Sequence, residues 1–320
     1  MSASITHDVI INAIKEKIPA NSNIANILIE NLHLSKEAVY RRLRGEVPFT
    51  FNEVAIIAKR FGISIDNIIL GETPKSRPFH LKLTEYINPT EDDYFQMEEY
   101  IALLHSSRDE LYTEMGTSSN LIPQTLHMKY DTLTKFYMFK WLYQTAGISN
   151  IKTLENIIIP ERLRNLQKRH IEECLYFKST YYVWDYLIFQ YLVNDIKNFE
   201  KINYISKDDV LSLKKDLLIL IDDIESLAAR GRFETGNKVQ FYVSHINLET
   251  AYSYMETNNY TLSLVNVFTL NSVSSLDRNT FYRLKRWMDS LKRLSTLISE
   301  SGEMQRVKFF RKQREIVNSL

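Results

Sequence analysis

The chain has 320 residues, of which 44% are apolar and 12% aromatic, and its formal net charge is only +1. This length suits two domains with sizeable cores, and the near-neutral balance excludes attraction to a polyanion by total charge alone. The single cysteine, Cys174, excludes an internal disulfide framework.

Neither the start of the chain nor its most apolar stretch predicts a membrane segment. The opening MSASITHDVI lacks the basic and apolar regions of a leader, so we expect a cytoplasmic protein. The most apolar stretch, YYVWDYLIFQYLV at residues 181–193, is too short to span a bilayer and is interpreted as a buried helix. With only 8 glycines and 7 prolines, the chain is predicted to be mainly α-helical.

The first 72 residues are predicted to form a domain of five short amphipathic helices, at residues 5–18, 24–32, 36–43, 51–61 and 65–70. Residues that favour helix starts precede four of them, and glycines that favour helix ends follow three. The candidate caps are Ser22 or Asn23, Ser35, Thr50 and Ser64, and the candidate stops are Gly45, Gly62 and Gly71.

Positive charge gathers in the stretch LSKEAVYRRLRGEV, residues 34–47. Its order of turn, helix and glycine resembles the helix-turn-helix module of the Cro and phage-repressor type of bacterial transcriptional regulator. The resemblance covers residues 5–72 and continues through TFNEVAIIAKRFGISID. The sequence departs from the family at His33, where glycine is usual, and at Ile29, where a small residue is usual. Histidine is among the residue types that tolerate positive φ.

The resemblance implies that residues 36–43 enter the major groove of double-stranded DNA, where side chains reach base edges and basic groups neutralise phosphates. We assign Lys36, Glu37, Tyr40 and Arg41 to base edges, and Ser35, Arg42, Arg44 and Thr50 to positions nearer the phosphates. The alternative is a solvated basic helix face in an ordinary helical protein.

A linker is predicted at residues 73–80, within GETPKSRP, and a second domain at residues 81–320. We expect this domain to be helical, with a small antiparallel sheet. The predicted helices are residues 92–115, 123–146, 160–178, 179–199, 206–229, 279–299 and 303–318. Alternation from Val239 onward predicts a three-stranded meander within residues 238–270, although a helical hairpin fits the same spacing.

No set of residues in the sequence requires catalysis, a metal or a cofactor. The group His170, Glu173 and Cys174 has no second cluster with zinc-type spacing, so a surface histidine and a buried thiol are expected. The many aromatic residues between 130 and 191 favour core packing, and the alternative is a pocket for a small apolar ligand or a peptide.

The sequence therefore predicts a sequence-specific DNA-binding regulator rather than an enzyme. Regulators that resemble this family bind as dimers, and one recognition helix reads only a few base pairs, so a homodimer is expected. The alternative is a peptide-sensing or partner-sensing regulator, in which the large C-terminal domain binds a ligand or another protein.

Overall fold

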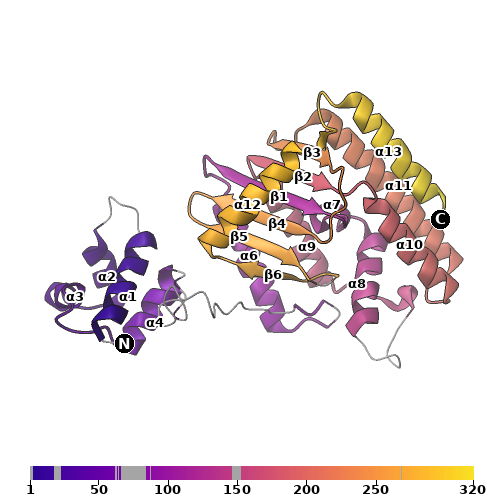
Figure 1. Cartoon of the computed structure of the whole chain (residues 1–320). Coiled ribbons are helices and arrows are strands. Elements are labelled where there is room, and N and C mark those ends of the chain that lie inside the picture. Colours follow the sequence, from indigo (N-terminus) through magenta and orange to yellow (C-terminus); the bar gives the residue numbers. More distant parts are fainter. Residues whose placement is uncertain are drawn as a thin grey trace. The chain divides into compact units, whose positions relative to one another are not determined.

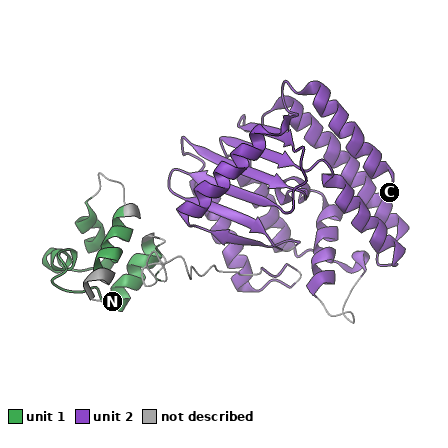
Figure 2. Ribbon diagram, viewed as in Figure 1, with its two compact units in different colours: residues 1–79 green, residues 80–320 purple. Residues whose placement is uncertain are grey.

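The computed structural model describes residues 3–17, 23–61, 63, 65, 84–86, 88–145, 153–267 and 269–320. The chain forms two compact units, residues 1–79 and 80–320 (Figure 2), and each has its own hydrophobic core. The predicted linker at residues 73–80 and most of the helix predicted at residues 65–70 lie outside the described residues.

Unit 1, residues 1–79, is helical, as the sequence predicts. The Asn23 side chain accepts hydrogen bonds from the amides of Ala25 and Asn26, so it caps the second helix. Ile14, Leu28, Val39 and Ile57 are almost completely buried at the centre of the unit. The described helices are α1 (Ala3–Lys17), α2 (Ile24–Leu32), α3 (Lys36–Leu43) and α4 (Phe51–Phe61).

Unit 2, residues 80–320, is built on a mixed sheet with seven described strands in the order β6-β5-β4-β1-β2-β3-β7 (Figure 1). The three neighbouring strands β1, β2 and β3 are parallel to one another, and the other strands pair antiparallel. The strands are β1 (Thr113–Ser119), β2 (Ser179–Trp184), β3 (Lys238–Val243), β4 (Tyr252–Thr257), β5 (Thr261–Asn266), β6 (Ser272–Ser275) and β7 (Thr296–Leu297).

This sheet overturns the predicted fold class, a helical chain with only a small antiparallel sheet. The stretch at residues 181–193 is not one buried helix, because most of β2 occupies its first four residues and α10 (Ile188–Lys201) its last six. A strand that is buried on both faces shows a continuous apolar run instead of alternation, and such a run is easily taken for helix. The helix predicted at residues 92–115 likewise ends at Ser106, and β1 begins at Thr113.

The antiparallel meander exists, but its strands differ from those predicted. It consists of β4, β5 and β6, with Asn258 and Asn259 between β4 and β5. The alternating strand from Val239, β3, pairs parallel with β2 instead. The helical hairpin that was the alternative for residues 238–270 is excluded by these pairings.

Helices cover both faces of the sheet, as Figure 1 shows. Helix α12 (Arg278–Arg293) packs on the face that carries Tyr181 and Tyr254. The opposite face, with Tyr182 and Phe241, contacts the main core of the remaining helices. These are α6 (Glu91–Ser106), α7 (Gln124–His127), α8 (Asp131–Thr145), α9 (Glu161–Cys174), α10, α11 (Lys207–Arg230), α13 (Glu303–Asn318) and the short 3-10 turn η2 (Leu154–Asn156).

The last two helices are part of the core of unit 2. Phe281 and Met288 of α12 are fully buried against the sheet, and Phe310 of α13 is fully buried in the main core. Arg314 of α13 also forms ion pairs with Asp222 and Glu225 of α11. Among the described residues, no helix combines the length and the apolar character needed to cross a membrane.

Candidate nucleic-acid interface

A tight turn joins α2 to α3, and its first residue is His33. This residue ends α2 with φ 53° and ψ 36°, in the left-handed region that usually favours glycine. The histidine therefore adopts the positive φ that the resemblance required at this position. Ser35 then starts α3, because its hydroxyl accepts a hydrogen bond from the Ala38 amide at 3.3 Å.

The eight residues of α3 divide into a buried and an exposed face. Val39 is fully buried, and Tyr40 and Leu43 pack half-buried against the core of unit 1. Tyr40, assigned from the sequence to a base edge, therefore has only part of its ring in solvent. Of the predicted site residues, those with exposed side chains are Ser35, Lys36, Glu37, Arg41, Arg44 and Thr50.

Arg42 points away from that exposed face and forms an ion pair with Glu53 of α4. Its Nε and Nη2 atoms donate to the two carboxylate oxygens of Glu53, each at 2.8 Å, and both side chains are only 13% exposed. The Nη1 atom also donates to the Ala38 carbonyl at 3.2 Å. This bidentate contact holds α3 against α4, and it occupies the guanidinium that the sequence assigned near the phosphates.

Glu53 also receives hydrogen bonds from the start of its own helix. The Thr50 amide donates to its carboxylate at 2.9 Å, and the Thr50 hydroxyl accepts from the Glu53 amide at 3.3 Å. Partial burial opposes ionisation of Glu53, but the bonds from Arg42 and Thr50 outweigh it and lower the pKa of the carboxyl group. Thr50 thus caps the start of α4 and orients the Glu53 carboxylate that pairs with Arg42.

A second acidic residue, Glu46, lies among the exposed basic side chains. Its carboxylate accepts a hydrogen bond from Arg44 Nε at 2.7 Å and lies 3.6 Å from Arg41 Nε. The hydrogen bond between Arg44 and Glu46 raises the pKa of Arg44 and lowers the pKa of Glu46. Both arginines therefore have an acidic neighbour, and Arg44 Nη2 also lies 3.8 Å from a carboxylate oxygen of Glu37.

Glycine is required where α3 ends. Gly45 has φ +75°, and the amide of Glu46 donates back to the Arg41 carbonyl at 2.9 Å, which closes the helix. The positive φ is the reason for glycine here, since an added Cβ atom would meet the His7 ring only at an ordinary contact distance of 3.5 Å. The end of α3 is therefore set by this left-handed residue.

Sequence reasoning missed both acidic partners of the basic segment. Glu53 stands three residues after Thr50, which is the spacing of a capping box, and this signal was present in the sequence. The ion pair between Glu53 and Arg42 joins two different helices, so no local spacing in the sequence predicts it. Glu46 was visible only as an acid next to Gly45.

The exposed face of α3 carries residue types that DNA-reading helices use. Lysine and arginine, as at Lys36 and Arg41, can donate to guanine or phosphate oxygens, and a glutamate carboxylate, as at Glu37, can accept from the amino group of cytosine. Elsewhere, among the described residues, no group of three or more His, Cys, Asp or Glu side chains is placed to hold a metal ion.

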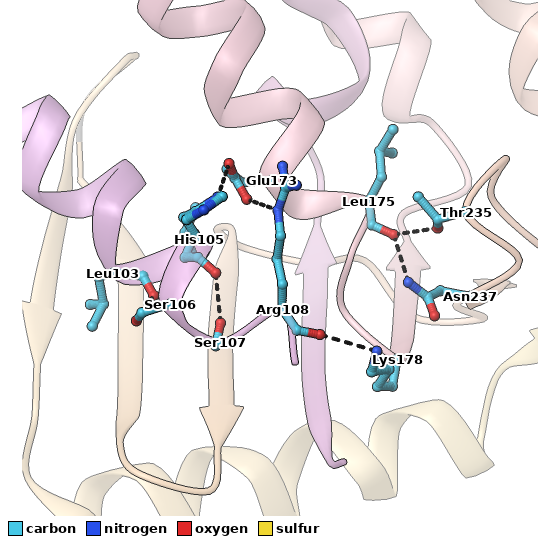
Figure 3. A network of polar contacts seen from close by, with 11 residues as sticks. Leu103, His105, Ser106, Ser107, Arg108, Glu173, Leu175, Lys178, Thr235 and Asn237 are labelled. Atoms are coloured by element: carbon cyan, nitrogen blue, oxygen red, sulfur yellow. Dashed lines mark hydrogen bonds and ion pairs between the residues drawn. The ribbon is translucent and has the colours of Figure 1, made fainter. Parts of the chain in front are cut away.

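A buried carboxylate in unit 2 fastens the carboxyl-terminal end of α6 (Figure 3). Glu173 of α9 accepts hydrogen bonds from Arg108 Nε at 2.5 Å and lies 3.0 Å from His105 Nδ1. The Arg108 guanidinium lies 3.7 Å above the Tyr176 ring, and the bond to Glu173 raises the pKa of Arg108. Lys178 donates to the Arg108 carbonyl at 3.1 Å. Helix α6 and the residues that follow it to Arg108 are therefore an integral part of unit 2.

Residues 4–109 match the family model of the BetR domain, about one third of the chain. The match indicates a DNA-binding N-terminal region of the helix-turn-helix regulator kind, and it does not single out the Cro and phage-repressor type. It covers the described helices of unit 1 and continues through α6 to the Glu173 network. Comparison with curated proteins and with solved structures gives no match.

Proposed function

We propose that the chain is a cytoplasmic transcriptional regulator that binds a specific double-stranded DNA sequence as a homodimer. In this proposal α3 lies in the major groove, Lys36, Glu37 and Arg41 contact base edges, and Arg44 contacts a phosphate. The larger unit 2 pairs the subunits and has no catalytic role.

The observation that carries the proposal is the way in which α3 is held. Its inner face is fixed by the buried Val39 and by the Arg42–Glu53 ion pair, while the side chains of Lys36, Glu37 and Arg41 remain exposed. A rigid helix that presents donors and acceptors on an exposed face is what major-groove readout requires. The alternative, a solvated basic helix with no partner, does not account for the bidentate Arg42–Glu53 ion pair on the inner face of α3.

Arg42 and Thr50 have positioning roles in this proposal. Because Arg42 is occupied by Glu53, it sets the angle of α3 instead of neutralising a phosphate. Thr50 orients Glu53 through two hydrogen bonds, and its exposed hydroxyl group lies at the start of α4.

The test is selection of bound duplexes from a random DNA library by the full-length protein at near-physiological salt. A variant with Lys36→Ala, Arg41→Ala and Arg44→Ala is compared with the wild type. Lys59→Ala with Arg60→Ala is the control, because these residues are also basic and exposed in unit 1 but lie at the far end of α4.

We expect the wild type and the control variant to enrich the same two-fold symmetric motif and the triple variant to lose it. Weak, salt-sensitive binding that all three proteins share, with no enriched motif, would contradict sequence-specific recognition by α3. An enriched motif without two-fold symmetry would contradict the homodimer.

A further inference from the structure

Unit 2 contains a cavity of about 600 Å³ on one face of its sheet. Its floor is made by residues of β1, β4, β5 and β6, and α6 and the end of α9 form its walls. Cavities that hold small molecules commonly have volumes between roughly 300 and 1,000 Å³. The size of this cavity is therefore suited to one organic molecule.

The described part of the cavity lining is uncharged. Among the described residues that line it, none is Asp, Glu, Lys or Arg. Apolar and sulfur-containing side chains form much of the surface, among them Met97, Met115, Met255 and Leu262. A charged ligand would lose its hydration here without gaining an ion pair, which is strongly unfavourable.

Neutral polar groups gather at one end of the cavity, where α6, α9 and β4 meet. The Tyr100 hydroxyl lies 3.4 Å from the Met255 sulfur, and the rings of Tyr100 and His170 are 5.6 Å apart. His170 Nε2 lies 3.8 Å from the Cys174 sulfur. Burial lowers the pKa of His170 to about 4 and raises the pKa of Cys174 to about 12, so both groups are neutral near pH 7.

Two polar atoms of side chains that line the cavity have no hydrogen-bond partner within the described part of the chain. They are the Tyr260 hydroxyl oxygen and the His170 Nδ1 atom. Buried polar groups in native proteins are almost always paired, so unpaired atoms in lining side chains favour a ligand that brings polar groups of its own. These groups both donate and accept, and they suit a hydroxyl or a carbonyl.

We propose that this cavity binds a small neutral molecule with an apolar body and one or two hydroxyl or carbonyl groups. The apolar body lies against Met97, Met115 and Leu262, and the polar group lies near His170 and Tyr260. This ligand site is independent of the proposed DNA contacts, because the described residues that line it all belong to unit 2.

The test measures binding of the neutral dye Nile red to the full-length protein, followed by displacement with 1-decanol or with decanoate at pH 7.4. The two competitors share an alkyl chain and differ in charge, so they separate a neutral site from general hydrophobic adsorption. We expect saturable dye binding with one site per chain, displacement by decanol, and at least tenfold weaker displacement by decanoate.

Two adjacent serines on the edge strand β6 give a matched pair of variants. Ser274 lines the cavity, and Ser275 is on the opposite face of the same strand. We expect Ser274→Phe to weaken decanol binding at least tenfold and Ser275→Phe to leave it unchanged. Tyr260→Phe, which removes one hydroxyl group and little volume, should weaken decanol binding about fivefold.

Three results would overturn the proposal: no saturable dye binding, equal displacement by decanoate and decanol, or equal effects of the two serine variants. Should Ser274→Phe fail to fold, as judged by its melting curve, the Tyr260→Phe result decides, and unchanged decanol affinity there also counts against the site. DNA selection with the same variants is scored separately, so failure of the ligand site and failure of DNA recognition are distinguishable.

Discussion

The two units differ in where they place their polar groups. Unit 1 exposes Lys36, Glu37 and Arg41 on a short helix. Unit 2 pairs some of its charges in its interior, as with Glu173 and Arg108, and it surrounds a cavity with neutral polar groups. This contrast is the basis of the two proposals, a charged partner for the surface of unit 1 and an uncharged ligand for the interior of unit 2.

The units also differ in what stabilises them. Unit 1 has a small helical core, and a bidentate ion pair between two mostly buried side chains joins α3 to α4. Unit 2 has a large core around a central sheet, in which close packing of rings leaves little space for added atoms. The variants below separate these two sources of stability.

The largest effect is expected from Gly116→Ala in β1. The added Cβ atom would lie 2.5 Å from the Tyr254 ring and 2.7 Å from the Tyr181 ring, and both rings are buried. Since Tyr254 is also held by Glu114 through a 2.6 Å hydrogen bond, the rings cannot easily move. We expect a loss of about 3 kcal/mol in the free energy of unfolding of unit 2.

Tryptophan fluorescence measures this loss directly, because Trp141, Trp184 and Trp287 all belong to unit 2. Gly236→Ala is the control. It also adds a methyl group, but with nothing within 4 Å, so it should cost only about 1 kcal/mol for its positive φ. Equal urea midpoints for the two variants would show that Gly116 is not closely packed.

The next effect is expected from Arg42→Ala in unit 1. The substitution leaves the Glu53 carboxylate without its charged partner and should destabilise the contact between α3 and α4 by about 2 to 3 kcal/mol. Hydrogen exchange measured by mass spectrometry on the full chain should show faster exchange of the α3 amides.

Arg41→Ala on the exposed face of the same helix is the matched comparison. It should leave hydrogen exchange of α3 unchanged while lowering specific DNA affinity by about 1 to 3 kcal/mol. If Arg41→Ala loosened α3 as much as Arg42→Ala does, the division of α3 into an anchoring and a reading face would be wrong.

Local signals explain why unit 1 was predictable from the sequence. Caps at Asn23 and Ser35 and the glycine at residue 45 act within a few residues of the chain, and the structure places a helix start or end at each. The partner of Arg42 depends on how two helices meet, and Glu53 lies eleven residues away in sequence. Whether the exposed side chains contact DNA stays a prediction.

Unit 2 was poorly predictable because its strands are defined by contacts between distant segments. In β2, all five residues of TYYVW are buried, so no alternation distinguishes the strand from a helix. The cavity was invisible for the same reason, since residues 97, 115, 170 and 262 meet only when the sheet forms. The predicted surface histidine at residue 170 is in fact a half-buried lining residue.

The interior of unit 2 should also make its stability depend on pH through His127. Burial, with a smaller contribution from Lys140, lowers the pKa of this histidine to about 3, against about 6.5 in an unfolded chain. As the pH falls below 6.5, the unfolded state therefore binds a proton that the folded state does not, and stability is lost. At pH 5 the loss should be about 2 kcal/mol.

The variant His127→Phe keeps a ring that can stack on Tyr137 but cannot be protonated. Urea unfolding of unit 2, followed by tryptophan fluorescence at pH 7.5 and pH 5, should show about 2 kcal/mol less acid destabilisation in the variant than in the wild type. An identical difference between the two pH values in both proteins would assign the acid sensitivity to other groups.

The smallest effect on stability, and the sharpest contrast between surface and interior, is expected from Glu46→Gln. Glu46 is exposed and competes for Arg41 and Arg44, so its neutralisation should leave the melting temperature unchanged and tighten DNA binding severalfold. The gain in DNA affinity should diminish at high salt, since it arises from charges that solvent ions screen.

Fluorescence anisotropy on the selected duplex at two salt concentrations measures this DNA affinity, with Glu300→Gln in unit 2 as a charge-matched control. Weaker binding by Glu46→Gln would mean that Glu46 orients the arginines for DNA instead of competing for them.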